Sequence, residues 1–249
     1  KNNNSLWIGW PGISHDEIDS LSIDKMNKKL YASGFYPVHL SSKDIKDFYY
    51  GLPNNCLWPL FHYFIEYSLF DNLQWEKYKE INKKFSDCVL SNLEKDDTVW
   101  IHDYQLMLCP KMIKDKRPDV KIGFFLHIPF PSFEIFRTFP RRKELLEGIL
   151  GSDVIGFHTY DYQRHFLSSV KRILKLDVNF NNVIYNNRKI LVNTFPMGID
   201  FKKFNNAAIN HSKQKTSEKS ELRKQLELHK KDSNESKLIL SIDRLDYTK

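Results

Sequence analysis

Thr98-Val-Trp-Ile-His-Asp-Tyr-Gln-Leu-Met107 and Lys121-Ile-Gly-Phe-Phe-Leu-His-Ile-Pro-Phe-Pro131 are the two stretches that decide the fold. Each begins as a short apolar strand and then breaks off into polar or proline-bearing residues. The first strand delivers His102 and Asp103, and the second delivers His127. Ligands of an open parallel sheet bind just outside the carboxyl ends of its strands. The two endings therefore predict one crevice lined by Asp103 and His127.

A second interpretation of the same residues stays open. Asp103 is a good N-cap for a helix that begins near Tyr104, because aspartate side chains accept hydrogen bonds from the first free N–H groups of a helix. His127 can equally be a turn histidine whose hydrogen bonds are satisfied locally. Two such endings, one strand–helix–strand unit apart, favour the crevice over two unrelated structural roles.

Strand-like and helix-like segments alternate along the chain. Residues Trp75, Tyr78, Ile81, Phe85 and Val89 recur every three or four positions in 74–93, which predicts a helix with one buried stripe. The expected strands are Leu6–Trp10, Pro37–Leu40, Thr98–Ile101, Val120–Leu126, Val154–Phe157, Ile190–Phe195 and Leu238–Ile242. Such alternation predicts an α/β fold with a mainly parallel sheet.

A hairpin is expected within this pattern at 183–192. Asn186 and Asn187 stand between two strand-like runs, and asparagine tolerates the positive φ angles of a tight hairpin turn.

The basic character of the chain is compatible with an anionic ligand. The formal net charge is +7 and the isoelectric point is about 9.1. Much of the excess lies in residues 213–237, where lysines alternate with glutamates and serines, so we interpret that segment as a solvated helix and loop. No zinc-finger or RNA-recognition motif accompanies the charge. Phosphorylated sugars and nucleotides therefore suit it better than nucleic acid does.

The remaining composition favours a cytoplasmic protein. Cys56, Cys88 and Cys109 are scattered among apolar residues, which is typical of reduced thiols rather than of a disulfide framework or a zinc site. The sequence has no apolar run near the roughly 20 residues that a membrane span needs. We expect no membrane partner.

A series of motifs in order gives the chain a family resemblance. Besides the two stretches quoted first, they are Trp7-Ile-Gly-Trp-Pro-Gly, Leu57-Trp-Pro-Leu-Phe-His-Tyr, Asp153-Val-Ile-Gly-Phe-His-Thr-Tyr-Asp-Tyr, Phe195-Pro-Met-Gly-Ile-Asp and Asp243-Arg-Leu-Asp-Tyr-Thr-Lys. From about Leu6 to Lys249 the sequence resembles the trehalose-6-phosphate synthase family, glucosyltransferases that act on UDP-glucose. The resemblance implies one Rossmann-like lobe of a glucosyltransferase-B type architecture with two lobes.

The same resemblance implies a reaction and a domain arrangement. Glucose passes from UDP-glucose to glucose-6-phosphate with retention of configuration, giving trehalose-6-phosphate and UDP, and no metal or other cofactor takes part. Residues 1–237 are expected to form the acceptor-side lobe without the Gly-rich loop that the family places upstream. Residues 238–249 are expected to begin a donor-binding lobe. A fragment of this kind is expected to be inactive alone. Whether its parent forms an oligomer or carries a fused phosphatase domain stays open from the sequence.

Site residues follow from the family's motifs. Tyr49 and Trp58 match the positions that hold the phosphate of glucose-6-phosphate, since a phenol O–H and an indole N–H can both donate to phosphate oxygens. Tyr50 is an alternative to Tyr49, because the local Tyr49-Tyr-Gly-Leu has Leu52 where the family tends to have Phe. Core packing is the alternative role for both aromatic side chains.

Catalytic and donor-side residues are carried over in the same way. Asp103 matches the carboxylate that contacts the acceptor sugar, and His127 matches a histidine near the transferred glucose. Arg244 and Lys249 match the pair that contacts the diphosphate, with a salt bridge of Arg244 to a nearby aspartate as the alternative. A metal site built from His62, His102 or His158 is disfavoured, because the chain has no HExxH or CxxC spacing.

A rival function belongs to another class. A non-catalytic sugar-phosphate-binding or regulatory subunit of a trehalose-synthesis complex would keep the acceptor lobe without the donor lobe. The joint presence of Tyr49, Trp58, Asp103, His127 and the two cations favours the enzyme, because a scaffold needs none of them.

Overall fold

The computed structural model describes residues 5–213 of the 249-residue chain. By its internal contacts the chain divides into two compact units, Lys1–Pro196 and Met197–Lys249. The expected boundary at 237/238, the strand Leu238–Ile242 and the pair Arg244 and Lys249 lie outside the described residues. Within the second unit the structure describes helix α9 (Phe201–Lys213), where Asp200 accepts a hydrogen bond from the Lys203 N–H at 3.0 Å.

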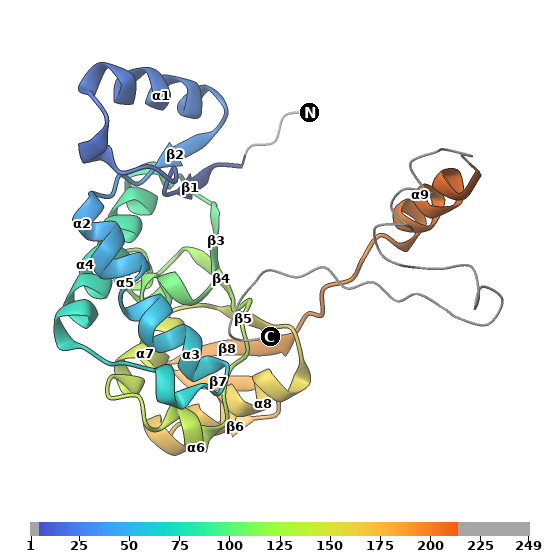
Figure 1. Cartoon of the computed structure of the whole chain (residues 1–249). Helices are drawn as coiled ribbons and strands as arrows, with labels where there is room; N and C mark the ends of the chain where they lie inside the picture. Colours follow the sequence, from blue (N-terminus) through green and yellow to red (C-terminus); the bar gives the residue numbers. More distant parts are fainter. Residues whose placement is uncertain (1–4, 214–249) are drawn as a thin grey trace. The chain divides into compact units, whose positions relative to one another are not determined.

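The first unit contains two sheets (Figure 1). Strands β3, β4, β5 and β8 are parallel neighbours, and β7 and β6 continue the six-stranded sheet in antiparallel pairing. Strands β1 and β2 form a separate parallel pair. The strands are β1 (Trp7–Gly9), β2 (Phe35–Pro37), β3 (Thr98–His102), β4 (Lys121–Phe125), β5 (Val154–Phe157), β6 (Val178–Asn179), β7 (Asn182–Tyr185) and β8 (Arg188–Thr194). The predicted mainly parallel α/β fold is confirmed.

The helices of this unit include one long helix and several short ones. They are α1 (Ser20–Ala32), α2 (Ser42–Asp44), α3 (Trp58–Phe61), α4 (Asn72–Asn92), α5 (Cys109–Lys116), α6 (Phe133–Phe136), α7 (Arg142–Ile149) and α8 (Tyr160–Ser169). None of the helices in residues 5–213 has the length and apolarity that crossing a bilayer requires.

Helix α4 confirms the predicted stripe. Asp71 caps its start by accepting a hydrogen bond from the Gln74 N–H at 2.9 Å. Trp75, Tyr78 and Ile81 have no exposed surface. Burying a large apolar side chain stabilises a fold by roughly 1.5–3 kcal/mol. This stripe therefore fixes α4 against the core beside α5.

The hairpin is also where the sequence places it. Asn186 and Asn187 have φ angles of 49° and 57°. Strands β7 and β8 pair in antiparallel register on either side of them, with Tyr185 opposite Arg188. By contrast, the strand expected at Pro37–Leu40 is wrong except for Pro37. Residues 35–37 form β2 instead, because the chain leaves α1 through Gly34, with φ 77°, and pairs at once with β1.

The two faces of the six-stranded sheet differ in their exposure. Ile101 on β3, Ile122 on β4 and Ile155 on β5 are buried on the helix-covered face. On the opposite face Trp100 is 68% exposed. Side chains two residues apart on a strand share a face. His102 therefore lies on the open side of the sheet with Trp100.

A buried carboxylate joins the segment after β2 to α4. Asp44 accepts hydrogen bonds from Lys77 at 3.0 Å and from Lys84 at 2.8 Å, and it forms a capping box with Ser41. Burial alone raises the pKa of the Asp44 carboxyl, but the hydrogen bonds from Lys84, Lys77 and Ser41 outweigh that effect. The pKa of Asp44 therefore falls well below its usual range.

This arrangement predicts an acid-dependent loss of stability. A carboxylate whose pKa is lowered by folding stabilises the protein above its unfolded pKa of about 3.9 and loses that contribution as the pH falls toward its folded pKa. Asp44→Asn should lower the free energy of unfolding at pH 7 by about 2 kcal/mol, the scale of hydrogen bonds to a charged group. It should also flatten the dependence of stability on pH below about 4.

Urea unfolding at a series of pH values measures both effects. Asp24→Asn, which changes an exposed carboxylate on α1, is the matched control and should leave the curve unchanged. Equal pH dependence in Asp44→Asn and the unsubstituted chain would show that the Asp44 pairing does not stabilise the fold.

Candidate functional site at the carboxyl ends of the parallel strands

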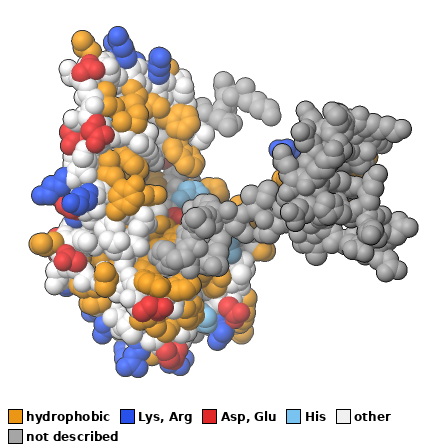
Figure 2. Space-filling view, in the orientation of Figure 1, with side chains coloured by type: hydrophobic (Ala, Val, Ile, Leu, Met, Phe, Trp, Pro, Cys, Tyr) orange, Lys and Arg blue, Asp and Glu red, His pale blue; other side chains and the backbone are white. Residues whose placement is uncertain are grey.

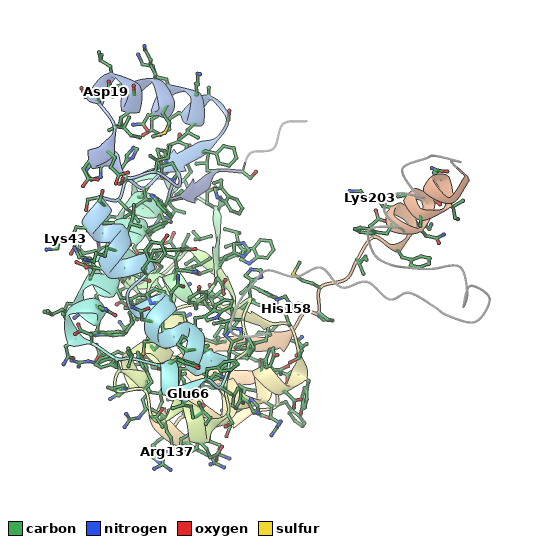
Figure 3. All side chains as sticks on the ribbon, viewed as in Figure 1. Asp19, Lys43, Glu66, Arg137, His158 and Lys203 are labelled. Atoms are coloured by element: carbon green, nitrogen blue, oxygen red, sulfur yellow. The ribbon has the colours of Figure 1, made fainter. Side chains whose placement is uncertain are left out.

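Three polar residues follow three neighbouring parallel strands. Asp103 follows β3, His127 comes two residues after β4, and His158 follows β5, where Figure 3 labels it. The strand ladder continues into this edge, because the Asp103 N–H donates to the Phe125 carbonyl at 2.8 Å. The structure therefore brings Asp103 and His127 together at one edge, as the sequence predicts.

Asp103 has an unusual backbone conformation. Its φ and ψ angles are 72° and 173°. This region of backbone space is essentially restricted to glycine, and holding another residue there costs on the order of 1–3 kcal/mol. Strain of this kind persists only where the surrounding structure enforces it, and it concentrates at functional sites.

The Asp103 carboxylate bridges the ends of two strands. It accepts a hydrogen bond from the His127 backbone N–H at 3.1 Å. The short 3-10 turn Tyr104–Leu106 begins next to it, but the Asp103 side chain makes no capping hydrogen bond there. The alternative role as a helix cap is therefore wrong, and the carboxylate fixes the position of His127 instead.

Helix α4 holds the turn that follows β3. Tyr78 donates a hydrogen bond to the Tyr104 carbonyl at 2.8 Å. Asn82, which has no exposed surface, donates to the Gln105 carbonyl at 2.9 Å and accepts from the Leu108 N–H at 3.1 Å. Buried hydrogen bonds of this kind are costly to break. They hold the turn in place and thereby maintain the strained backbone conformation of Asp103.

Burial also changes the acidity of the site. It raises the pKa of the Asp103 carboxyl, while hydrogen bonds from the backbone N–H groups of Tyr104 and His127 oppose the rise. An aspartate whose carboxylate is already partly desolvated forms a stronger hydrogen bond with a ligand's donor group than one in bulk water does.

Three histidines gather at this edge. His102 Nδ1 and His127 Nε2 are 2.9 Å apart, and the rings of His127 and His158 are 5.6 Å apart in an edge-to-face arrangement. His127 is exposed, whereas His102 and His158 are half-buried. Figure 2 shows histidine side chains at the surface of this unit, beside hydrophobic ones. Burial first, and then the proximity of His127, lowers the pKa values of His102 and His158.

Tyr49 and Trp58 lie on the segment between β2 and α4. The Tyr49 ring contacts Trp10 with centroids 5.7 Å apart, and Trp58 contacts Tyr104 with centroids 5.6 Å apart. Tyr104 in turn donates a hydrogen bond to Asn54 at 2.8 Å. Trp58 therefore contacts the residue that directly follows Asp103.

Both aromatic side chains also serve the core. Tyr49 and Trp58 are half-buried and pack against it, while Tyr50 is 60% exposed. The packing role and a ligand role are compatible, because a half-buried ring keeps one edge accessible. Gly51 allows the sharp turn after Tyr50: a Cβ there would lie 1.9 Å from the Asp47 carbonyl oxygen.

His102 and Trp7 were not singled out as ligand-site residues from the sequence. A signal for His102 was available, because it ends the first apolar strand directly before Asp103. In the parallel register it lies opposite Phe125, which is two residues before His127. The contact of Trp7 with His102 joins two separate sheets and has no local signature. In the part of the chain that the structure describes, no group of three or more His, Cys, Asp or Glu residues could hold a metal ion.

Comparison with known proteins agrees with the family resemblance. The family model of glycosyltransferase family 20 matches residues 1–249. The chain belongs to glycosyltransferase family 20. It is 47% identical over 250 residues to the α,α-trehalose-phosphate synthase (UDP-forming) of Pichia angusta, covering 98% of this chain and 50% of that protein. It is 40% identical to a bifunctional trehalose-6-phosphate synthase/phosphatase of Thermoproteus tenax, covering 98% of this chain and 32% of that protein.

Solved structures give the same fold for this family 20 chain. The UDP-forming α,α-trehalose-phosphate synthase of Burkholderia xenovorans superimposes with a TM-score of 0.73 at 29% identity, covering 85% of this chain and 46% of that one. The trehalose-6-phosphate phosphatase N-terminal domain of Candida albicans gives a TM-score of 0.72 at 38% identity, covering 88% and 46%. The chain thus spans half or less of the length of these relatives.

The backbone strain at Asp103 predicts that the usual order of stability of a glycine and an alanine variant is reversed there. Asp103→Ala and Asp103→Gly both remove the hydrogen bond to His127, but only glycine relieves the strain. Asp103→Gly should therefore be the more stable by about 1–3 kcal/mol. At an ordinary position glycine is the less stable of the two by roughly 0.5–1 kcal/mol.

Chemical unfolding of the two variants measures the difference directly. The matched control is the same pair of substitutions at Asp119, an exposed residue whose φ is not positive. A glycine variant that is no more stable than the alanine variant at 103 would show that the backbone there is unstrained.

Proposed function

We propose that this chain forms the acceptor-side part of an α,α-trehalose-phosphate synthase (UDP-forming). The reaction transfers glucose from UDP-glucose to glucose-6-phosphate with retention, and releases UDP. Membership of glycosyltransferase family 20 and the 47% identity to the Pichia angusta synthase support this function. The observation that carries the proposal is the half-buried Asp103, with its strained backbone, beside the exposed His127 at the carboxyl ends of parallel strands.

The proposed roles of the acceptor-side residues are carried over from the family's motifs. Asp103 accepts hydrogen bonds from hydroxyls of the acceptor sugar, and His127 contacts the glucose that is transferred. Tyr49 and Trp58 donate to the phosphate of glucose-6-phosphate from rings that the core holds in place. Binding energy from that remote phosphate orients the reacting hydroxyl, and orientation lowers the barrier of a transfer between two bound sugars.

The donor side of the proposal rests on Arg244 and Lys249. The leaving diphosphate gains negative charge in the transition state, and preorganised cations stabilise that charge. Arginine offers a planar fork and lysine a point charge, and phosphate oxygens accept both. In this proposal the two cations act without a metal ion.

A non-catalytic role is the second candidate, and one comparison favours it. The Candida albicans structure with the same fold is named as the N-terminal domain of a trehalose-6-phosphate phosphatase. A domain of that kind could bind sugar phosphate for a fused or associated phosphatase without transferring glucose. The synthase is preferred because the acceptor residues, His127 and the two cations occur together in this sequence.

The proposal includes a cellular location. We place the protein in the cytoplasm, where UDP-glucose and glucose-6-phosphate are made and used. The side chains of Cys56, Cys88 and Cys109 are free thiols, which fits a reducing compartment.

Asp103→Asn tests the function in a polypeptide that contains this sequence and has the full length of the family relatives. The amide keeps the size of the side chain but loses the charge that orients the acceptor. Turnover should fall by roughly 100-fold or more, the scale for removal of one preorganised polar group. The free energy of unfolding should change by less than about 1 kcal/mol.

Trehalose-6-phosphate formation and thermal melting on the same samples decide between the candidates. Asp119→Asn is the control at an exposed aspartate and should retain normal turnover. The 249-residue chain assayed alone should show negligible turnover. A full-length protein that binds glucose-6-phosphate but forms no trehalose-6-phosphate would support the non-catalytic role instead.

Arg244→Ala tests the metal-independent diphosphate site. Loss of this cation should cost catalysis about 2–4 kcal/mol. The effect should appear in the kinetics for UDP-glucose and leave the apparent affinity for glucose-6-phosphate nearly unchanged, and excess chelator should not inhibit the unsubstituted enzyme. Arg117→Ala, at a half-buried arginine paired with Asp119, is the control. Complete inhibition by chelator, or normal activity of Arg244→Ala, would contradict the proposed site.

A further inference from the structure

We infer that His102 is a positioning residue that fixes the tautomer of His127 and leaves His127 Nδ1 as the ring atom available to the bound sugar. This inference deepens the proposed function, in which His127 contacts the transferred glucose. It concerns a residue that no family motif in this sequence singles out for a role.

The geometry of the pair carries the inference. His102 Nδ1 lies 2.9 Å from His127 Nε2, which is hydrogen-bond distance. The two rings are nearly parallel, at 27°, with centroids 5.2 Å apart. The exposed His127 ring thus has one of its two nitrogens occupied by the half-buried ring beside it. Only Nδ1 remains for a ligand.

A neutral imidazole carries one proton, so the pair has two arrangements. If His102 Nδ1 carries its proton, it donates to His127 Nε2, and His127 must then carry its own proton on Nδ1. If His102 Nδ1 is bare, His127 Nε2 carries the proton and Nδ1 becomes an acceptor. In either arrangement the partner nitrogen determines whether the sugar meets a donor or an acceptor.

The surroundings of His102 hold its ring still. Trp100 packs against it with centroids 4.7 Å apart, and Trp7 stacks on it at 6.2 Å with an interplanar angle of 22°. Burial lowers the pKa of His102, and the nearby His127 lowers it further, whereas Asp103 opposes both effects. The ring is therefore neutral near pH 7, which is the state in which it can select a tautomer of its neighbour.

His127 is positioned from its backbone as well. Its N–H donates to the Asp103 carboxylate at 3.1 Å, and the edge of His158 faces its ring. The backbone bond sets where the residue lies, and the ring bond to His102 sets how the imidazole is turned and protonated. Removal of an outer hydrogen-bond partner from a metal-binding histidine typically costs 10–100-fold in affinity or activity, and we expect an effect of about that size here.

Two substitutions of His102 separate the hydrogen bond from ring packing. His102→Phe keeps a flat ring between Trp7 and Trp100 but has no nitrogen. His102→Asn loses the ring but places an amide group where Nδ1 was, so it can restore a hydrogen bond to His127 Nε2. A purely structural role for His102 predicts that Phe is the better replacement, and the positioning role predicts that Asn is.

Long-range ¹H–¹⁵N correlation spectra of the histidine rings test the inference on the 249-residue chain, without any assay of activity. At about pH 8, above the ordinary histidine pKa of about 6.5, His127 should show one protonated and one bare nitrogen with widely separated ¹⁵N shifts. His102→Phe should move both shifts toward averaged values, and His102→Asn should keep them apart. His39→Phe, which removes a histidine bonded to Asn27 at 3.0 Å, should leave His127 unchanged.

An unchanged His127 spectrum in His102→Phe would overturn the inference, whatever the activity of the protein. In the full-length enzyme His102→Phe should lower kcat/KM for UDP-glucose by about 10–100-fold, leave the KM for glucose-6-phosphate within a few-fold, and be rescued by His102→Asn. Normal kinetics in His102→Phe would also overturn it. A full-length protein without synthase activity would instead refute the proposed function, and the spectra would still decide the tautomer.

Discussion

The hydrogen bond from the His127 N–H to the Asp103 carboxylate is the contact on which the site depends. It joins the ends of two adjacent parallel strands at 3.1 Å and fixes the Asp103 carboxylate relative to the His127 backbone. In the structure that carries this bond, Asp103 has φ 72° and ψ 173°, a conformation that costs on the order of 1–3 kcal/mol for a residue other than glycine. The fold is therefore less stable by this amount, and in return the Asp103 carboxylate is held in one orientation.

That constraint explains why the long helix α4 matters to the site. Its buried stripe anchors it in the core, and from there Tyr78 and Asn82 bind the backbone of the turn after β3. Tyr104 in the same turn contacts Trp58. Core packing, the strained turn and the aromatic edge of the proposed acceptor site thus form one continuous network, and a change in α4 should reach the ligand residues.

Much of this arrangement could be predicted from the sequence. Strands β3 and β4 and the meeting of Asp103 with His127 follow from apolar runs that end in polar residues, and the hairpin follows from Asn186 and Asn187. Other features have no local signature. The positive φ of Asp103 is imposed by tertiary hydrogen bonds, and the stacking of Trp7 on His102 joins segments 95 residues apart. The roles of Arg244 and Lys249 rest on the motif alone.

The most direct test of a glucose-6-phosphate site beside Asp103 is a titration of the chain followed through its tryptophan indole N–H signals in ¹H–¹⁵N spectra. The chain has five tryptophans. Glucose-6-phosphate should shift the Trp58 signal in a saturable way, glucose should do so far more weakly, and Trp75, fully buried in the core, should not move. Equal responses to both sugars, or an unmoved Trp58 at saturating glucose-6-phosphate, would contradict the account.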